Sequence, residues 1–284
     1  MKNIEIGLNT KWWNLYPNIL FVKEKKGTIN LPEIEIVQKN ISFNLNDLRQ
    51  YNQLCEIINS DFVPATYLHI ISMPTHLKLL TLKETGLALF GLIHLSNIIK
   101  QYRNIRKTEI INIKTKFGEL YSHEKGQAIE ISTQIFVQSE LVWESSTIFL
   151  KKGKKGNGPE YLAKPIDLTE SFTKEWWSFP YFLGQKYAFV SGDFNPIHLF
   201  PLSAKIFGMP KHIAHGMYSK AKILGCLTKD LKTDRFEIGV YFKLPIYLPA
   251  KIVFRKNIEN DTIIFDLVDE KMEKPHLKGY LQPI

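Results

Sequence analysis

Alternation of apolar and polar residues is the clearest pattern in the first half of the chain. The runs at residues 109–117, 128–138 and 139–150 alternate well enough to predict three strands. Upstream, within residues 84–103, apolar residues recur at spacings that can bring them to one face of a helix. These are Leu87, Phe90, Leu95 and Ile98. The first half is therefore expected to be one long helix followed by a meander of strands.

The second half shows the same order of patterns. Residues 216–231 have Ala221, Leu224 and Leu231 at helical spacings, and strand-like runs follow at 235–244, 251–257, 262–268 and 277–281. Successive strands joined by short turns need no crossover helix, so each sheet is expected to be antiparallel. The repeated order indicates an internal duplication of an α+β unit, although little residue identity accompanies it.

The break between the halves is the string KKGKKGNGP at residues 151–159, where lysine, glycine and proline replace the alternation. Such a composition is typical of a loop or linker. A chain of 284 residues also suggests roughly two domains. We therefore expect an N-terminal domain at 1–150, a linker at 151–159 and a C-terminal domain at 160–284.

Composition excludes several classes of protein. With 44% hydrophobic and 23% charged residues, the chain has the balance of a soluble globular protein rather than a disordered one. Its two cysteines, Cys55 and Cys226, are too few for a disulfide framework, so a reducing compartment is expected. The first residues lack the apolar core of a signal peptide, and polar residues interrupt the most apolar stretch at 87–99. A cytoplasmic protein without a membrane span is expected.

The net charge of +9 is concentrated in the second half. Residues 1–150 carry 16 Lys and Arg against 14 Asp and Glu, whereas residues 151–284 carry 21 against 14. A basic surface suits nucleic acid, anionic lipid or an acidic protein or cofactor, and charge alone does not choose among them. The charge is diffuse and has no interleaved basic and aromatic motif, which argues against nucleic acid. A solvated lysine-rich loop also accounts for the run at 151–155.

The densest polar cluster lies within YAFVSGDFNPIH, residues 187–198. A strand-like run is expected to end at Ser191 and Gly192, which would place Asp193 in a sharp turn. Asn195 suits a helix cap before Pro196, and His198 would then lie in the first helical turn. A carboxylate facing an imidazole can move protons near neutral pH. Ordinary turn chemistry with one satisfied histidine remains an equal alternative.

A second cluster, residues 213–217, places Gly216 where the long helix should begin. Free N–H groups at a helix start favour negative charge, and a glycine allows a substrate oxygen to approach them. These are the requirements of an oxyanion site. A glycine that merely starts a helix, without any ligand, fits the sequence as well.

Taken together, YAFVSGDFNPIH, the segment at 204–208 and IAHGM at 213–217 closely resemble the signature of MaoC-like (R)-specific enoyl-thioester hydratases and dehydratases. Further strings in the second half, including VYFKLPIYLPAKIVF, resemble that domain's strands. In the first half, FVPATYLHIISMPTHLKLL and LFGLIHLSNIIKQYR resemble the degenerate N-terminal domain of two-domain members. Residues 1–150 contain no Asp-x-Asn-Pro-x-His, so one site per chain is expected.

The resemblance implies a double hot-dog fold, an α+β architecture in which each half wraps an antiparallel sheet around a long central helix. It assigns Asp193 and His198 as the catalytic pair, Asn195 as a positioning residue and the Gly216 backbone N–H as the oxyanion donor. Ser191 and His215 match pattern positions without an assigned role. Phe200 departs from the polar residue of many relatives, which concerns only the adjoining pocket.

The implied activity is that of a hydro-lyase of fatty-acid metabolism, which interconverts a trans-2-enoyl thioester and a (3R)-3-hydroxyacyl thioester. The carrier of the thioester would be coenzyme A or acyl carrier protein, and no metal or other cofactor is expected. The N-terminal domain would supply an apolar tunnel for the acyl chain, and the chain would act as a monomeric double hot-dog or a homodimer. A non-catalytic acyl-thioester-binding protein and a hot-dog thioesterase are the alternatives.

Overall fold

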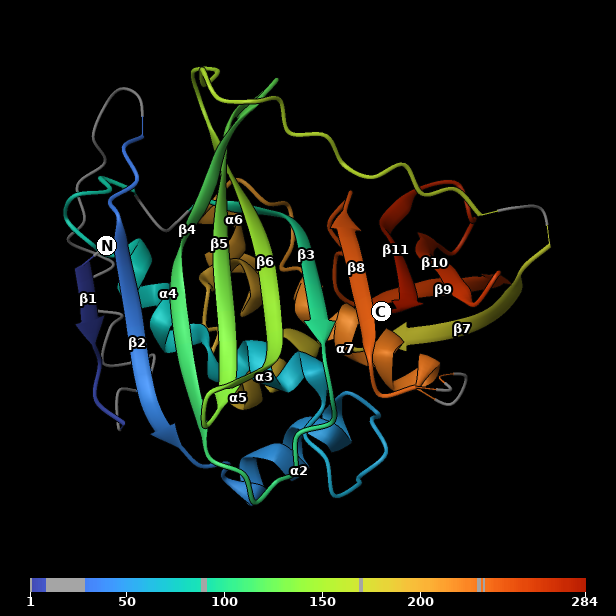
Figure 1. Cartoon of the computed structure of the whole chain (residues 1–284). Coiled ribbons are helices and arrows are strands. Elements are labelled where there is room, and N and C mark those ends of the chain that lie inside the picture. The colour runs from blue at the N-terminus through green and yellow to red at the C-terminus, as the bar shows by residue number, and fades with distance from the viewer. Residues whose placement is uncertain (1, 9–28, 88–90, 169–170, 229–230, 232) are drawn as a thin grey trace. The chain divides into compact units, whose positions relative to one another are not determined.

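The structure is a computed structural model that describes residues 2–8, 29–87, 91–168, 171–228, 231 and 233–284. It divides into two compact units (Figure 1). The first unit comprises Met1–Leu45 and Asp61–Leu162, and the second comprises Asn46–Ser60 and Ala163–Ile284. A short segment of the N-terminal half thus belongs to the second unit, which a division of the sequence near residue 150 does not anticipate.

In its described residues, the first unit is a six-stranded sheet packed against two short helices. Its strands follow the order β1-β2-β4-β5-β6-β3, and all neighbours except the parallel pair β1 and β2 are antiparallel. The elements are β1 (Lys2–Glu5), β2 (Ile34–Ile41), α3 (Ala65–Ile71), α4 (Met73–Leu80), β3 (Ile93–Gln101), β4 (Ile111–His123), β5 (Gly126–Val137) and β6 (Glu140–Lys152). The strand predictions for 109–117, 128–138 and 139–150 are confirmed.

The helix expected at 84–103 is wrong. Residues 93–101 form β3, which pairs along its length with β6, and residues 88–90 lie outside the described part of the chain. The apolar positions fit a helical face only by coincidence, because a short apolar run does not distinguish a helix from a strand. The helices that the described residues of this unit form are instead α3 and α4, where Pro64 precedes the first helix and Pro74 lies in the first turn of the second.

Apolar side chains of α4 and of the sheet form the core of the first unit. Leu79 from α4, Ile36 from β2, and Ile129 and Ile131 from β5 are all fully buried there. In Figure 1, α4 lies behind β2 and β4, as its contacts with both strands require. Burial of these apolar side chains is the main term that stabilises the unit.

The second unit contains a five-stranded antiparallel sheet with the order β8-β11-β10-β9-β7. Its elements are α2 (Leu45–Leu54), β7 (Thr173–Phe179), α5 (Leu183–Ser191), the 3₁₀ helix η1 (Pro196–His198), α6 (Pro201–Ile206), α7 (Gly216–Leu227), β8 (Phe236–Phe242), β9 (Ala250–Glu259), β10 (Thr262–Asp269) and β11 (Pro275–Pro283). The helix predicted from 216 and the four strands predicted after it are confirmed. Residues 229–230 of the predicted helix lie outside the described residues.

Helix α7 is buried almost all round, as expected of a helix at the centre of a domain. Even Lys220 is fully buried, and its Nζ donates a hydrogen bond to the Ile238 carbonyl of β8 at 3.0 Å. Lys222 pairs with Glu56 and lies 4.8 Å from the Trp177 ring centroid. The two lysines therefore tie the central helix to the sheet and to the segment after α2.

The strand-like run expected to end at Ser191 is wrong, because residues 183–191 form helix α5. Its buried residues include Leu183, Tyr187, Ala188 and Ser191, whose spacing is helical, whereas Phe189 is 77% exposed. The four residues of the apolar run Tyr-Ala-Phe-Val are too few to show that period. Among the described residues, no helix is long and apolar enough to cross a membrane.

A buried histidine makes the stability of the first unit dependent on pH. His76 on α4 is 1% exposed, and its Nε2 bonds to Thr133 Oγ1 at 2.7 Å. Burial lowers its pKa from 6.5 to about 4. Below pH 6.5, His76 therefore binds a proton in the unfolded chain but not in the folded chain. The free energy of unfolding must then fall as the pH decreases towards about 4.

We expect His76→Asn to flatten this dependence. Urea unfolding at pH 7, 6 and 5 should show a free energy of unfolding that falls with acidity in the wild type, and a slope that is shallower in the variant by up to about 1.4 kcal/mol per pH unit. Parallel curves for the two proteins would contradict a neutral His76 in the folded state.

Candidate active site

The site is built on the turn that follows α5. Gly192 ends the helix with φ 78°, a left-handed conformation that glycine adopts without strain, and its N–H donates to the Ala188 carbonyl at 2.8 Å. The Asp193 N–H then donates to Ser191 Oγ at 3.2 Å, and Asp193 Oδ1 accepts the Asn195 N–H at 3.2 Å. These bonds fix the backbone of the turn and one oxygen of the carboxylate.

His198 ends the short helix η1, where Asn195 is the N-cap and accepts the Ile197 N–H. The ring is 8% exposed, and its Nδ1 lies 2.9 Å from the Ile213 carbonyl oxygen. Since a carbonyl only accepts, Nδ1 carries the proton and Nε2 keeps the lone pair. Burial lowers the pKa of His198 below 6.5, although the Asp193 carboxylate acts in the opposite direction. The ring is therefore a neutral base at pH 7.

A glycine lets α5 approach this histidine. A Cβ placed on Gly184 would lie 1.9 Å from the His198 carbonyl oxygen, so only glycine fits there. The Gln185 amide of the same helix donates to the Leu199 carbonyl. Helix α5 and η1 are consequently held as one piece with the site turn between them.

His215 contacts both Asp193 and His198. Its ring stacks on His198 with centroids 3.7 Å apart and an interplanar angle of 24°. Its Nε2 donates to the Asp193 carbonyl oxygen at 3.0 Å and lies 3.8 Å from Asp193 Oδ2. Burial, and to a smaller extent the neighbouring His198 ring, lowers the pKa of His215 to about 3. A single neutral ring thus contacts both Asp193 and His198.

Gly216 is the first residue of α7, and His215 is its N-cap without a side-chain hydrogen bond to the helix. The first N–H groups of a helix have no intrahelical acceptor and carry positive partial charge. A Cβ on Gly216 would meet Phe242 Cε1 at 2.6 Å, so the Phe242 ring would have to move to admit a side chain here. The helix start adjoins the stacked histidines because His215 immediately precedes it.

The ligand atoms of Asp193, His198 and His215 all lie within 4.8 Å of one another. Three such groups could also hold a metal ion. Two of the ring nitrogens, however, donate to backbone carbonyls, which leaves His215 Nε2 without a lone pair towards Asp193. The arrangement suits proton transfer between a carboxylate 35% exposed, a neutral imidazole and a water or substrate beside them.

The structure brings together the residues that the sequence singles out. Asp193 and His198 face one cluster, and Gly216 starts the helix next to it. Asn195 lies in the same loop, but its Oδ1 is used as the cap of η1. No role was predicted for His215, although it matches a position of the family pattern and directly precedes the predicted helix start.

Behind His215 lies a layer of tyrosines that sequence reasoning also missed. The Tyr187 ring is 4.9 Å from that of His215, and the Tyr51 ring of α2 is 6.2 Å from Tyr187. Burial raises the pKa of Tyr187 well above 10.0, so it is a neutral wall of the site. Tyr51 is 142 residues before Asp193 in the chain, and no local pattern connects the two.

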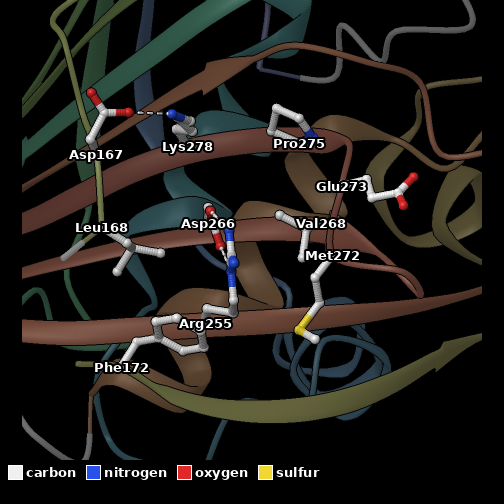
Figure 2. Close-up of a pocket in the computed structure, with 10 residues that line it drawn as sticks. All are labelled: Asp167, Leu168, Phe172, Arg255, Asp266, Val268, Met272, Glu273, Pro275 and Lys278. Carbon is white, nitrogen blue, oxygen red and sulfur yellow. Dashed lines mark hydrogen bonds and ion pairs between the residues drawn. The ribbon is translucent and has the colours of Figure 1, made fainter. Parts of the chain in front are cut away.

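A separate hollow of about 280 Å³ lies over β9, β10 and β11 (Figure 2). Neither Asp193 nor His198 lines it. Arg255 holds the Asp266 carboxylate through two hydrogen bonds of 2.9 and 2.6 Å, and Lys278 pairs with Asp167 at 2.6 Å. Both cations of this hollow are thus paired, and we assign it no chemistry.

Comparison with known proteins gives one family match and several relatives. The family model described as "MaoC like domain" matches residues 184–279, which include every candidate site residue. The protein "3-hydroxyacyl-thioester dehydratase X" of Mycobacterium tuberculosis is 27% identical over 235 residues, or 78% of this chain and 80% of that protein.

Two solved structures of Mycobacterium tuberculosis proteins identify the fold. The crystal structure of HtdX superposes with a TM-score of 0.77 at 25% identity, and covers 88% of this chain and 100% of that one. A conserved hypothetical protein described as having a double hot-dog fold superposes with a TM-score of 0.56 at 9% identity, over 90% of this chain and 95% of its own. The expectation of an α+β double hot-dog fold is confirmed.

Variants of His215 can separate its two contacts. His215→Phe keeps a ring over His198 but loses the donor to Asp193, whereas His215→Ala loses both. Because burial lowers the pKa of His198, we expect that pKa to rise towards 6.5 in His215→Ala, where water can enter, and to stay low in His215→Phe. NMR titration of the His198 ring measures both. An identical pKa in wild type and His215→Ala would contradict the role of the stack.

Proposed function

Residues 184–279 belong to the MaoC-like domain family, and from this premise we propose that the chain is a hydro-lyase acting on acyl thioesters. It adds water to a trans-2-enoyl thioester to give a (3R)-3-hydroxyacyl thioester, and catalyses the reverse dehydration. The observation that carries the proposal is the Asp193 and His198 pair, held together by His215 at the start of α7. The name of the mycobacterial relative supports the same reaction class.

In the hydration direction a water molecule lies between Asp193 and His198. The lone pair of His198 Nε2 and the Asp193 carboxylate accept hydrogen bonds from this water and activate it for attack on C3 of the substrate. One O–H bond breaks as the C3–O bond forms, and the C2–C3 π electrons move towards the thioester carbonyl. Protonation of C2, by a proton that the pair returns, completes the addition.

The helix start stabilises the charge that develops on the thioester oxygen. The Gly216 N–H donates to this oxygen, and the dipole of α7 adds to the effect. A fixed donor in a site shielded from water is worth roughly 3 kcal/mol in such reactions. This role needs no side chain at residue 216, consistent with the Phe242 ring that would clash with one.

The remaining expectations extend the proposal. Residues 1–150 lack the dyad motif and would bind the acyl chain, while the carrier is coenzyme A or acyl carrier protein in fatty-acid metabolism. Both described cysteines, Cys55 and Cys226, are free thiols, which fits a reducing and cytoplasmic location. Asn195 would orient water or substrate through the part of its amide that does not cap η1.

Substitution of the pair tests the proposal. We expect Asp193→Asn and His198→Gln each to lower the rate of crotonyl-CoA hydration by about 10²- to 10⁴-fold, because each removes a proton-transfer group. Loss of enoyl absorbance measures the rate. Asp167→Asn, which removes an exposed carboxylate of the same unit, is the matched control and should keep wild-type activity.

Three results would contradict the proposal. Unchanged hydration in both dyad variants would remove the pair from the mechanism. Release of free thiol from the same substrates would indicate a thioesterase. Binding of enoyl thioesters from C4 to C16 on both carriers without any turnover would indicate a non-catalytic acyl-thioester-binding protein.

A further inference from the structure

Helix α5 exposes apolar side chains and a lysine along one face. Phe182 and Phe189 are 59% and 77% exposed, and Lys186 lies between them at a spacing that brings all three to the same side. The opposite face, with Leu183 and Tyr187, is buried in the second unit. The exposed phenylalanines therefore do not contribute to the core.

Helix α6 shows the same combination. Leu202 and Ile206 are 76% and 77% exposed, and the exposed Lys205 lies beside them at helical spacing. Ala204 faces inward and is fully buried. Two successive helices thus each present two large apolar side chains and one lysine to solvent. We call these six residues the entrance surface: Phe182, Lys186, Phe189, Leu202, Lys205 and Ile206.

The entrance surface is attached directly to the dyad loop. Helix α5 ends two residues before Asp193, and α6 begins three residues after His198. Between them, η1 is bound to both helices, since Gln185 of α5 donates to the Leu199 carbonyl and Ser203 Oγ of α6 donates to the Pro196 carbonyl at 2.7 Å. A molecule docked on these helices would therefore lie beside the loop that carries Asp193 and His198.

Apart from Asp193, the charged residues around these two helices are all basic. Residues 180–212 contain three lysines, Lys186, Lys205 and Lys211, and a single acid, Asp193. All three lysines are exposed, and none forms an ion pair within the described part of the chain. Exposed apolar side chains grouped with one sign of charge mark a protein-binding surface with a preference for an acidic partner.

We propose that the entrance surface docks an acidic acyl carrier protein, which presents the substrate thioester on its flexible phosphopantetheine arm. The inference rests on the proposed function and selects one of its two carriers. Coenzyme A instead needs a local cluster of donors for its phosphates. An acidic amphipathic helix matches both the apolar residues and the lysines.

The same charges disfavour a second copy of the chain as the occupant. A two-fold contact would place the same surface on both sides and would bring the lysines of the two copies together, with no acid of the surface to offset them. An acidic carrier removes this repulsion. The proposal therefore commits to the carrier, and self-association is an outcome that the test must be able to detect.

The test compares one acyl group on two carriers. The double variant Lys186→Glu/Lys205→Glu is assayed with a trans-2-octenoyl group on acyl carrier protein and on coenzyme A. We expect its KM for the carrier-bound substrate to rise at least about tenfold, with an unchanged KM for the coenzyme A substrate. Leu202→Ser/Ile206→Ser should behave alike. Lys154→Glu/Lys155→Glu makes the same charge change in the lysine-glycine segment and should alter neither KM.

Equal effects on the two substrates, or none, would overturn the proposal. Light scattering supplies a further criterion, because a wild-type dimer that Lys186→Glu/Lys205→Glu dissociates would assign the surface to a second copy. Flotation with anionic vesicles that depends on the same lysines would assign it to a membrane, and would equally overturn the proposal.

Failure of the proposed function has a different signature. If wild-type protein hydrates neither substrate, titration with holo acyl carrier protein alone decides the docking. Binding that Lys186→Glu/Lys205→Glu weakens would support the docking, and absence of binding would overturn it. If coenzyme A substrates are hydrated and the carrier does not bind, the docking fails while the hydratase proposal stands.

Discussion

Two neutral imidazoles stacked in a buried space are the constraint on which the site depends. His198 and His215 lie 3.7 Å apart between ring centroids, and both are almost fully buried. Burial disfavours a charged imidazole and therefore lowers the pKa of both rings. Each neutral ring then carries one proton and one lone pair. Each ring donates a hydrogen bond to a backbone carbonyl, and these bonds orient the rings. The lone pair of His198 Nε2 is then left for the proposed proton transfer.

Three glycines shape the scaffold around the stack. Gly184 brings α5 against the His198 carbonyl, Gly192 turns the chain into Asp193, and Gly216 starts α7 under the Phe242 ring. The central helix is in turn held by buried lysines and by the segment that follows α2. The turn that carries Asp193 is thus held between packed helices, as the proposed catalysis requires of positioned groups.

The candidate site could be found in the sequence because its residues lie close together along the chain. Asp193, Asn195 and His198 lie within six residues, and glycine and proline define the turn between them, so spacing and residue type suffice. The contacts made by Tyr51 could not be predicted, because they join α2 to a helix more than 130 residues away. Short apolar runs caused both errors of secondary structure. By period alone, residues 93–101 and 187–190 each fit a helix or a strand. Residues 93–101 form a strand because they pair with β6, and residues 187–190 form a helix that packs on η1.

The stereochemistry of the hydration product tests the central claim most directly. A dyad that holds water on one side of a bound enoyl thioester, with the carbonyl fixed at the start of α7, must deliver hydroxyl to a single face of C3. Chiral chromatography of the 3-hydroxybutyryl group formed from crotonyl-CoA measures the outcome. The account predicts the (3R) product alone. A (3S) product or a racemic mixture would contradict it.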